Sequence, residues 1–308
     1  MFKKFLARLG KGSARVDLVL EKDAYRLGEE IRGELVIQGG TVEQDINKID
    51  IDLMVYVRGE KLEQSALVNR FSFPEKFTIG PSEVKSFPFQ YTLPENLLVS
   101  GYSVSYAFIT HLDIAGGVDS SDRDPVTVLP PTRLQRVLEA FQSLGFQEKY
   151  GSRSFDGHLQ EFEMQPTDLF KGEVEEIEFC AVIQDDGIAL LLETDVLTFA
   201  GEKEIKRELW LENSLLDNPD QLAEHLRQVI AETVQQPHVF PAYDKKQFSS
   251  KFSSAAGAIG AFAIGLITVE LLEDALEDAI EEIFDNDDDD DEEGGDLFGN
   301  FFGGDEED

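Results

Sequence analysis

The chain has 308 residues, of which 42% are apolar, so the composition excludes a wholly disordered or collagen-like chain. A formal net charge of −35, from 62 acidic and 27 basic residues, repels phosphate backbones and excludes nucleic acid as an expected partner. The single cysteine, Cys180, excludes an intramolecular disulfide framework and is typical of a reducing compartment.

Residues 1–12 form a basic amphipathic segment. The apolar residues Phe2, Phe5, Leu6 and Leu9 would share one side of a helix. The basic residues beside them are Lys3, Lys4, Arg8 and Lys11. Such a helix can lie on an anionic membrane or dock on an acidic helix, and the alternative is a frayed terminus with no partner. Because the segment lacks the apolar core of a signal peptide, we expect a cytoplasmic protein, peripheral to the inner membrane if the helix contacts lipid.

Residues 13–130 have the pattern of many short strands. Apolar and polar side chains alternate from Ile49 to Arg58 and again from Tyr102 to Phe108. A period of two places one set on a core face and the other outward. Glycine and proline turns such as Gly39-Gly40 and Gly80-Pro81 separate the apolar runs. The pattern predicts an antiparallel β-sandwich.

Within these strands, Tyr25-x-x-Gly28 is predicted to be structural. Gly28 can adopt a positive φ between two strands, and Tyr25 can cover the edge of the sandwich.

Three stretches of this region follow one another in a fixed order: Leu20 to Gly33, Phe87-Pro88-Phe89 followed by Leu93-Pro94, and Thr110 to Asp124. Together they resemble the bacterial sporulation-control family called SpoOM, whose members are arrestin-like, over about residues 13–200. One departure is Leu27, where the family often has proline, and it affects only a turn. The resemblance implies a mainly β fold of two tandem arrestin-like (immunoglobulin-like) antiparallel β-sandwiches. It also implies a non-enzymatic role in the control of cell development.

Four aspartates near the end of this region are candidate site residues: Asp113, Asp119, Asp122 and Asp124. Their spacing lacks the Gly and Glu of an EF-hand loop, which disfavours a high-affinity calcium site. Exposed turn-forming aspartates are a second interpretation. The family resemblance implies a third, because arrestin-like folds bury an Asp/Arg network between their domains, and such a polar lock can act as a switch.

Residues 131–240 are predicted to form the second domain. Pro130-Pro131 is typical of a short stiff linker, and the apolar residues from Leu134 to Leu144 recur at helical spacing. Strand-like runs follow, and Asp185-Asp186-Gly187 joins two of them as a predicted hairpin turn. Residues 222–234 predict another helix. The resemblance implies that the strands here form the second sandwich.

Residues 241–308 are predicted to form a separate appendage, an Ala/Gly-rich helix and an acidic helical or disordered tail. Residues 252–269 carry no charge, but 18 residues are few for a membrane-spanning helix, so packing on a partner is the other interpretation. Residues 270–308 contain 20 acidic residues and no basic one. An interaction helix is predicted here, with an apolar side formed by Ile267, Leu271, Leu272, Leu276, Ile280 and Ile283.

No motif in the sequence predicts catalysis. The four histidines are far apart and lack metal-ligand spacing, and no nucleophile elbow, phosphate-binding loop or dinucleotide fingerprint occurs. Cys180 lies in an apolar run and is predicted to be a small buried side chain. We therefore expect no enzyme, no cofactor and no metal.

The sequence thus predicts an arrestin-like adaptor that regulates development or stress responses through contacts with other proteins. The alternative is a membrane-associated scaffold anchored by the 252–284 helix.

Overall fold

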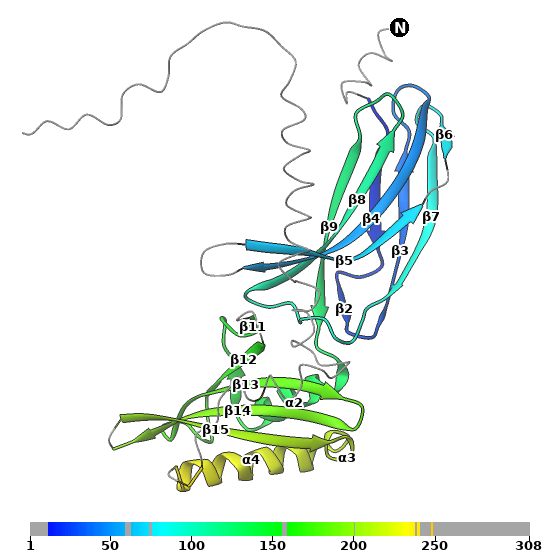
Figure 1. Ribbon diagram of the computed structural model, residues 1–308. Helices are drawn as coiled ribbons and strands as arrows, with labels where there is room; N and C mark the ends of the chain where they lie inside the picture. The colour runs from blue at the N-terminus through cyan, green and yellow to red at the C-terminus, as the bar shows by residue number, and fades with distance from the viewer. Residues whose placement is uncertain are drawn as a thin grey trace, which may run out of the picture. The chain divides into compact units, whose positions relative to one another are not determined.

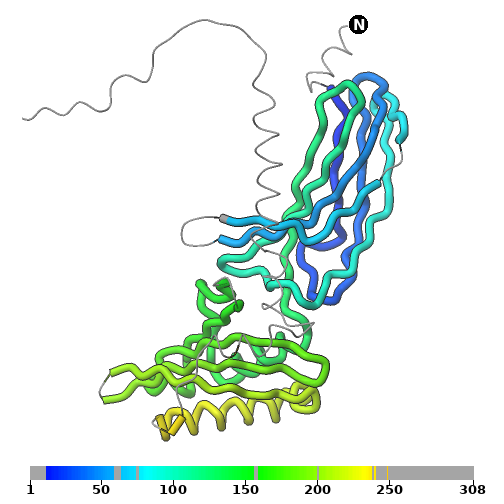
Figure 2. Tube along the Cα trace, viewed as in Figure 1, coloured from blue at the N-terminus to red at the C-terminus, as the bar shows by residue number. Residues whose placement is uncertain are grey.

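The computed structural model describes residues 12–58, 63–73, 76–155, 159–199, 201–237, 239–240 and 248. The chain divides into two units, residues 1–268 and 269–308, and every described residue belongs to the first. Within that unit two β-domains follow one another along the chain (Figures 1 and 2). We call them the N-terminal β-domain (residues 12–129) and the C-terminal β-domain (residues 132–240).

The part of the N-terminal β-domain that the structure describes contains two sheets. The smaller is antiparallel and consists of β1 (Arg15–Leu20), β3 (Glu30–Gln38) and β7 (Val84–Thr92), in the order β1-β3-β7. The larger has the order β2-β9-β8-β4-β5, with β6 also pairing with β4. Its strands are β2 (Ala24–Arg26), β4 (Gln44–Arg58), β5 (Glu63–Phe73), β6 (Phe77–Ile79), β8 (Val104–Ile114) and β9 (Ser120–Leu129). All pairs are antiparallel except β2 with β9.

The core of this domain lies between the two sheets. Alternate side chains of β4, among them Ile51 and Leu53, have no exposed surface, as the period of two predicts. The ring of Phe108 on β8 meets that of Phe89 on β7 edge to face, with centroids 5.5 Å apart. The predicted β-sandwich is therefore present in this domain.

The turn after β2 confirms the structural role predicted for Tyr25 and Gly28. Gly28 has a φ of +82°, a conformation that favours glycine. Tyr25 is buried, and its hydroxyl donates to the carbonyl of Arg32 at 3.2 Å while it accepts from the amide of Lys22 at 3.0 Å. The side chain thus ties β3 to the turn that precedes β2.

In its described residues, the C-terminal β-domain contains one six-stranded antiparallel sheet and three helices. The sheet has the order β10-β12-β13-β14-β15, and β11 pairs with β12. Its strands are β10 (Phe146–Glu148), β11 (Ser154–Phe155), β12 (Gln160–Pro166), β13 (Val174–Gln184), β14 (Gly187–Thr198) and β15 (Gly201–Glu212). The helices are α2 (Thr132–Ser143), α3 (Asn213–Leu216) and α4 (Pro219–Gln235).

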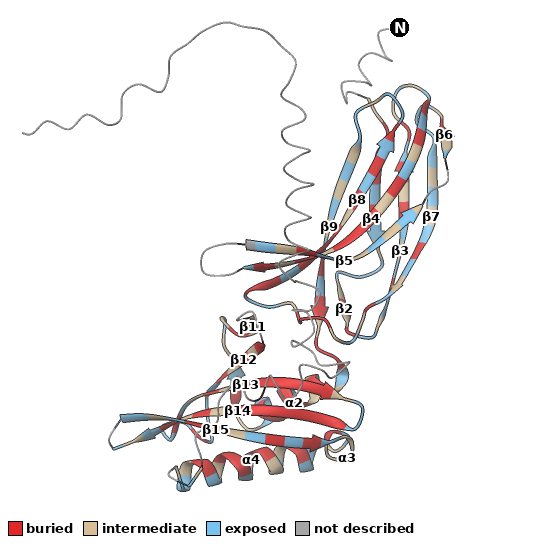
Figure 3. Cartoon of the chain, viewed as in Figure 1, coloured by how far each residue is buried: buried red, intermediate tan, exposed pale blue. Residues whose placement is uncertain are grey.

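The second layer of this domain is helical in the described residues, where the resemblance implies a second sheet. The apolar sides of α2 and α4 share one buried cluster with one face of the sheet. For example, the ring of Phe141 on α2 stacks on Phe179 of β13 with centroids 5.3 Å apart. Buried residues line β13, β14 and α4 in Figure 3. The amphipathic helices thus bury the sheet face that a second sheet would cover in a sandwich.

Two local predictions in this domain are confirmed. Gln184 pairs with Gly187, so Asp185 and Asp186 form a two-residue hairpin turn between β13 and β14. Cys180 is 2% exposed in the middle of β13, as expected for a small buried side chain.

Candidate interdomain site

Two loops that are far apart in sequence meet where the β-domains join. One contains residues 100–103, just before β8, and the other contains residues 149–153, between β10 and β11. The amide of Tyr102 donates to the carbonyl of Ser152 at 3.3 Å, and the amide of Phe155 donates to Oγ of Ser103 at 2.8 Å. The first bond joins the backbones of the two domains, and the second joins the backbone of the C-terminal β-domain to a side chain of the N-terminal β-domain.

The side chain of Gln160 makes the most buried of these connections. It is 3% exposed at the start of β12, and its Oε1 accepts from the amide of Val99 at 2.8 Å. Its Nε2 donates to the carbonyl of Val99 at 2.7 Å and to that of Arg153 at 3.0 Å. One amide side chain thus satisfies both backbone groups of Val99, as a neighbouring strand would.

Gly101 and Arg153 approach each other closely at the same place. A Cβ on Gly101 would lie 2.2 Å from Cβ of Arg153, so only glycine fits there. Arg153 has a φ of +63°, which is uncommon for a residue with a side chain. Its Nη1 donates to the carbonyl of Ser100 at 3.3 Å. Sterics and hydrogen bonding therefore fix this pair of loops together.

The charges of the second loop are balanced within the C-terminal β-domain. Arg153 binds Glu148 through two hydrogen bonds, of 2.7 and 3.0 Å, which is the bidentate geometry of a strong ion pair. Lys149 pairs with Glu163 at 3.1 Å and with Glu176, and these partners raise its pKa. The cations of this loop thus serve structural ion pairs.

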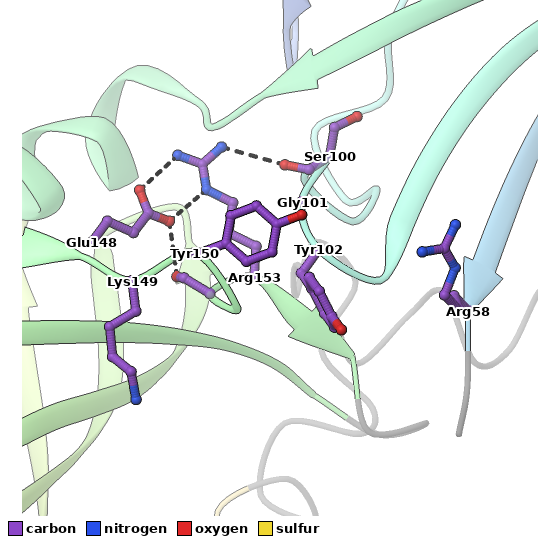
Figure 4. A pocket seen from close by; sticks show the side chains of 9 residues that line it. Arg58, Ser100, Gly101, Tyr102, Glu148, Lys149, Tyr150 and Arg153 are labelled. Carbon is purple, nitrogen blue, oxygen red and sulfur yellow. Dashed lines mark hydrogen bonds and ion pairs between the residues drawn. The ribbon is translucent and has the colours of Figure 1, made fainter. Parts of the chain in front are cut away.

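A cavity of about 380 Å³ opens between the two loops (Figure 4). The rings of Tyr102 and Tyr150 meet at its mouth with centroids 5.8 Å apart, and Tyr150 is 93% exposed. Arg58, the last residue of β4, also lines it. Among the described residues that line this cavity, Glu148 is the one carboxylate, and none is a histidine or a cysteine.

A second cavity, of about 410 Å³, lies beside the linker. Nη1 of Arg26 donates to the carbonyl of Pro130 at 2.6 Å. Arg133, in the first turn of α2, donates to the carbonyl of Gln184 at 2.6 Å and to Oδ1 of Asn213 at 3.0 Å. Both arginines that line the cavity thus hold backbone of the linker and of the β13–β14 turn.

The four aspartates predicted as a polar lock lie on β8, on β9 and in the turn between them. Asp113 accepts from Nδ2 of Asn47 at 2.8 Å, and Asp119 accepts from the amide of Ile114 at 2.8 Å. Both interactions lie inside the N-terminal β-domain, whereas Gln160, Arg153 and Ser103 make the interdomain hydrogen bonds described above. A role of these aspartates in an interdomain lock stays a prediction.

The structure brings Asp122 and Asp124 together with Asp17 of β1. One oxygen of each carboxyl lies within 4.8 Å of the others. Burial, and then the charges of Asp122 and Asp17, raise the pKa of Asp124 to about 7. The turn aspartate Asp119 is not in this group.

Several predicted residues lie outside the described part of the chain. These are Lys3, Lys4, Arg8 and Lys11 of the N-terminal segment, and Ile267, Leu271, Leu272, Leu276, Ile280 and Ile283 of the predicted interaction helix. Among the residues that are described, none forms a helix long and apolar enough to cross a membrane.

Sequence reasoning missed Gln160, Gly101 and Arg153. Gln160 lies 61 residues from Val99, and such a contact has no periodic signal in a single sequence. The only available hint was that Gly101 stands in a turn between two strand-like runs, which is a common place for glycine.

Comparison with known proteins gives a consistent result. A family model described as "SpoOM protein" matches residues 2–197. The sporulation-control protein spo0M of Bacillus subtilis (strain 168) is 37% identical over 207 residues, which cover 63% of this chain and 80% of that protein. The crystal structure of Spo0M from Bacillus subtilis aligns with a TM-score of 0.57 at 30% identity, covering 72% of this chain and 99% of that chain. The predicted mainly β, arrestin-like fold class is confirmed.

Proposed function

Because this chain belongs to the SpoOM family, we propose that it is a regulatory adaptor that acts without catalysis, through contacts with other proteins, in the control of cell development. The observation that supports this most is the 37% identity to a sporulation-control protein over most of that protein's length. The interdomain site agrees with the proposal, because the side chains of Arg153, Glu148 and Lys149 are engaged there in ion pairs.

The proposal assigns the two β-domains a binding role. Antiparallel sheets have edges that can accept a partner strand by backbone hydrogen bonding. The interdomain hydrogen bonds hold the two β-domains together, so that a partner can contact both at once. We place the protein in the cytoplasm, in agreement with its single cysteine.

Complementation tests the function directly. A Bacillus subtilis strain that lacks its own spo0M receives the full chain, and the frequency of heat-resistant spores is counted. We expect the full chain to move this frequency towards that of the parent strain. An expressed, folded chain that leaves spore counts unchanged contradicts the proposal.

A matched pair of variants separates the interdomain site from general effects of mutation. Gly101→Arg forces a large side chain against Arg153, whereas a Cβ on Gly151 has no neighbour closer than 4.0 Å. If the joined domains are the functional unit, the Gly101→Arg protein should be present in the cell at the normal level but should no longer restore the spore count. The Gly151→Ala protein should still restore it. If the two variants restore the spore count equally well, the function does not depend on the interdomain site.

A location at the inner membrane is the further part of this proposal, and it rests on the basic N-terminal segment and on the uncharged stretch of residues 252–269. Fractionation tests it. Release from the pellet by salt indicates peripheral contact, an alkali-resistant pellet indicates a span, and a protein found only in the supernatant excludes both.

A further inference from the structure

The sheet of the C-terminal β-domain has two different faces. On β13, Ile177 and Phe179 belong to the cluster that α2 and α4 cover. The side chains between and beyond them, Glu178, Cys180 and Val182, point to the opposite side because successive residues of a strand alternate. We call that opposite side the outer face.

One end of the outer face is apolar and buried. Cys180 pairs across the strands with Leu191, and Val182 pairs with Ala189. Together with Leu159 they form a second hydrophobic cluster, separate from the core beneath the helices. Their exposed fractions are at most 3%, so other parts of the chain cover them.

Phe248 belongs to this outer cluster, and its side chain has no exposed surface. It lies 13 residues beyond the end of α4 at Gln235, and α4 packs on the other side of the sheet. Arg207, for instance, donates to the carbonyl of Val229 on α4 at 2.8 Å. The chain therefore has α4 on one face of the sheet and Phe248, further along the sequence, on the opposite face.

The rest of the outer face is acidic, and it begins one row from the apolar end. Strand pairing places Glu163, Glu178 and Glu193 side by side, next to the row that contains Cys180. Carboxylate oxygens of Glu161, Glu178 and Glu193 lie within 4.8 Å of one another. Burial, and then the neighbouring carboxylates, raise the pKa of Glu178 to about 7.

Two lysines neutralise part of this face. Lys149 pairs with Glu163 and Glu176, and Lys206 pairs with Glu193 at 3.0 Å and Glu204 at 2.7 Å. Further acidic side chains on the same face are Asp195, Glu202 and Glu208. The carboxylates outnumber the lysines, so the outer face is complementary to a basic segment.

The sequence around Phe248 has this complementary charge. Residues 236–308 contain three lysines, and all of them, Lys245, Lys246 and Lys251, lie within three residues of Phe248. The rest of this region is acidic or uncharged. An aromatic anchor with flanking lysines therefore matches a surface made of an apolar pocket with an acidic border.

We propose that the outer face of the C-terminal sheet is a docking site for a basic segment with an aromatic anchor, and that residues 245–251 of this chain occupy it through Phe248. This inference goes beyond the proposed regulatory function and does not depend on it. The contact fixes the point at which the C-terminal appendage leaves the C-terminal β-domain. A basic, aromatic segment of another protein would have to displace it in order to bind the same face.

The single cysteine provides the test, because Cys180 lies in the cluster that Phe248 closes. The full-length protein is reacted with a maleimide, and the rate of modification at Cys180 is measured under native conditions. We expect Phe248→Ala to increase this rate at least about tenfold, since a removed aromatic side chain leaves its cluster open. Phe240→Ala is the matched control, because that ring lies against Arg207, 4.3 Å from its guanidinium carbon, and its loss should leave the rate unchanged.

Charge is tested separately in a chain that keeps its anchor. Replacing Lys245, Lys246 and Lys251 by glutamate should speed the labelling of Cys180, and added salt should speed it in the unaltered chain through screening. A synthetic peptide of residues 243–253 should slow labelling of the Phe248→Ala variant. Circular dichroism before labelling shows that each variant is folded.

Three outcomes overturn the proposal. If Cys180 is modified as slowly in the folded Phe248→Ala variant as in the unaltered chain, Phe248 is not the anchor. Equal rates for the Phe248→Ala and Phe240→Ala variants remove the specificity of the contact. Labelling that responds neither to the glutamate substitutions nor to salt removes the basic segment as the occupant.

Discussion

At the scale of single residues, the C-terminal β-domain and the N-terminal β-domain are joined by side chains that replace backbone partners. Gln160 binds the amide and the carbonyl of Val99, a residue with no exposed surface. Such groups cost free energy when they lose their hydrogen bonds. Gln160 should therefore contribute more to the free energy of unfolding than the side-chain amide of a surface glutamine does.

Gln160→Leu tests this at nearly constant side-chain size. We expect the free energy of unfolding to fall by about 2–4 kcal/mol, because the two buried groups of Val99 stay unpaired. Urea unfolding followed by circular dichroism measures the change. Gln165→Leu on the same strand is the control, since Gln165 is exposed and its replacement should change stability by no more than about 0.5 kcal/mol. Equal effects of the two substitutions would contradict the role of Gln160.

Asp124 predicts a dependence of stability on pH. Burial and the nearby Asp122 and Asp17 raise its pKa from 3.8 to about 7 in the folded protein. The folded state therefore binds this proton more tightly than the unfolded state, and the resulting stabilisation is lost as the pH rises through about 7. We expect Asp124→Asn to raise the melting temperature at pH 8 and to reduce the difference between pH 6 and pH 8.

Thermal melts at both pH values measure this effect. Glu178, Glu193 and Asp195 of the outer face also have raised pKa values, but all three are present in both proteins, so the comparison isolates Asp124. Asp23→Asn, at an exposed position, should leave the difference between the two pH values as it is in the unaltered chain. A melting temperature of Asp124→Asn that falls at pH 8 would show that the carboxylate stabilises the fold.

At the scale of elements, the strands and helices follow from local patterns. The period of two in β4 and β8, and the Asp185-Asp186-Gly187 turn, predicted strands and a hairpin where the structure has them. The helical spacing after Pro131 predicted α2. The helical layer on the C-terminal sheet could not be predicted in the same way, because an apolar strand face looks alike in sequence whether a helix or a second sheet covers it.

The start of α4 offers a test at this scale. Oδ1 of Asn218 accepts from the amide of Gln221 at 3.2 Å, so Asn218 caps the helix, and Pro219 is its first residue. Asn218→Ala should lower the free energy of unfolding by about 1 kcal/mol. Asn218→Asp should lower it by much less, because aspartate also caps helices. Chemical denaturation of the three proteins measures this. A capping role is excluded if the Ala and Asp variants lose the same amount.

At the scale of the whole molecule, what single-sequence reasoning misses is the contact between domains. Residues such as Ser103 and Phe155 are 52 positions apart, and neither type signals a hydrogen bond to the other. The resemblance to a family supplied the tandem arrangement, and the aspartates that it suggested for a lock have their described hydrogen bonds within one domain. Contacts of this kind depend on how two finished surfaces meet, which is a property of the folded chain.

The close approach of Gly101 and Arg153 predicts how the β-domains unfold. With the interdomain contacts intact, we expect calorimetry to show one cooperative transition for both β-domains. Gly101→Ala forces the loops apart, because its Cβ would lie 2.2 Å from Cβ of Arg153, and two transitions should then appear. Gly151→Ala should keep a single transition. Two transitions in the unaltered chain would show that the interdomain contacts are too weak to couple the domains.

The parallel pairing of β2 with β9 has a consequence for synthesis on the ribosome. Ala24 pairs with Thr127 and Arg26 pairs with Leu129. The early strand β2 therefore cannot form these pairs until β9, the last strand of the domain, has been synthesised. The N-terminal β-domain cannot close until about 130 residues have emerged, since these pairs join distant parts of the chain. Until then the apolar edges of its early strands are exposed, and this nascent stage is the one at which a chaperone would be most useful.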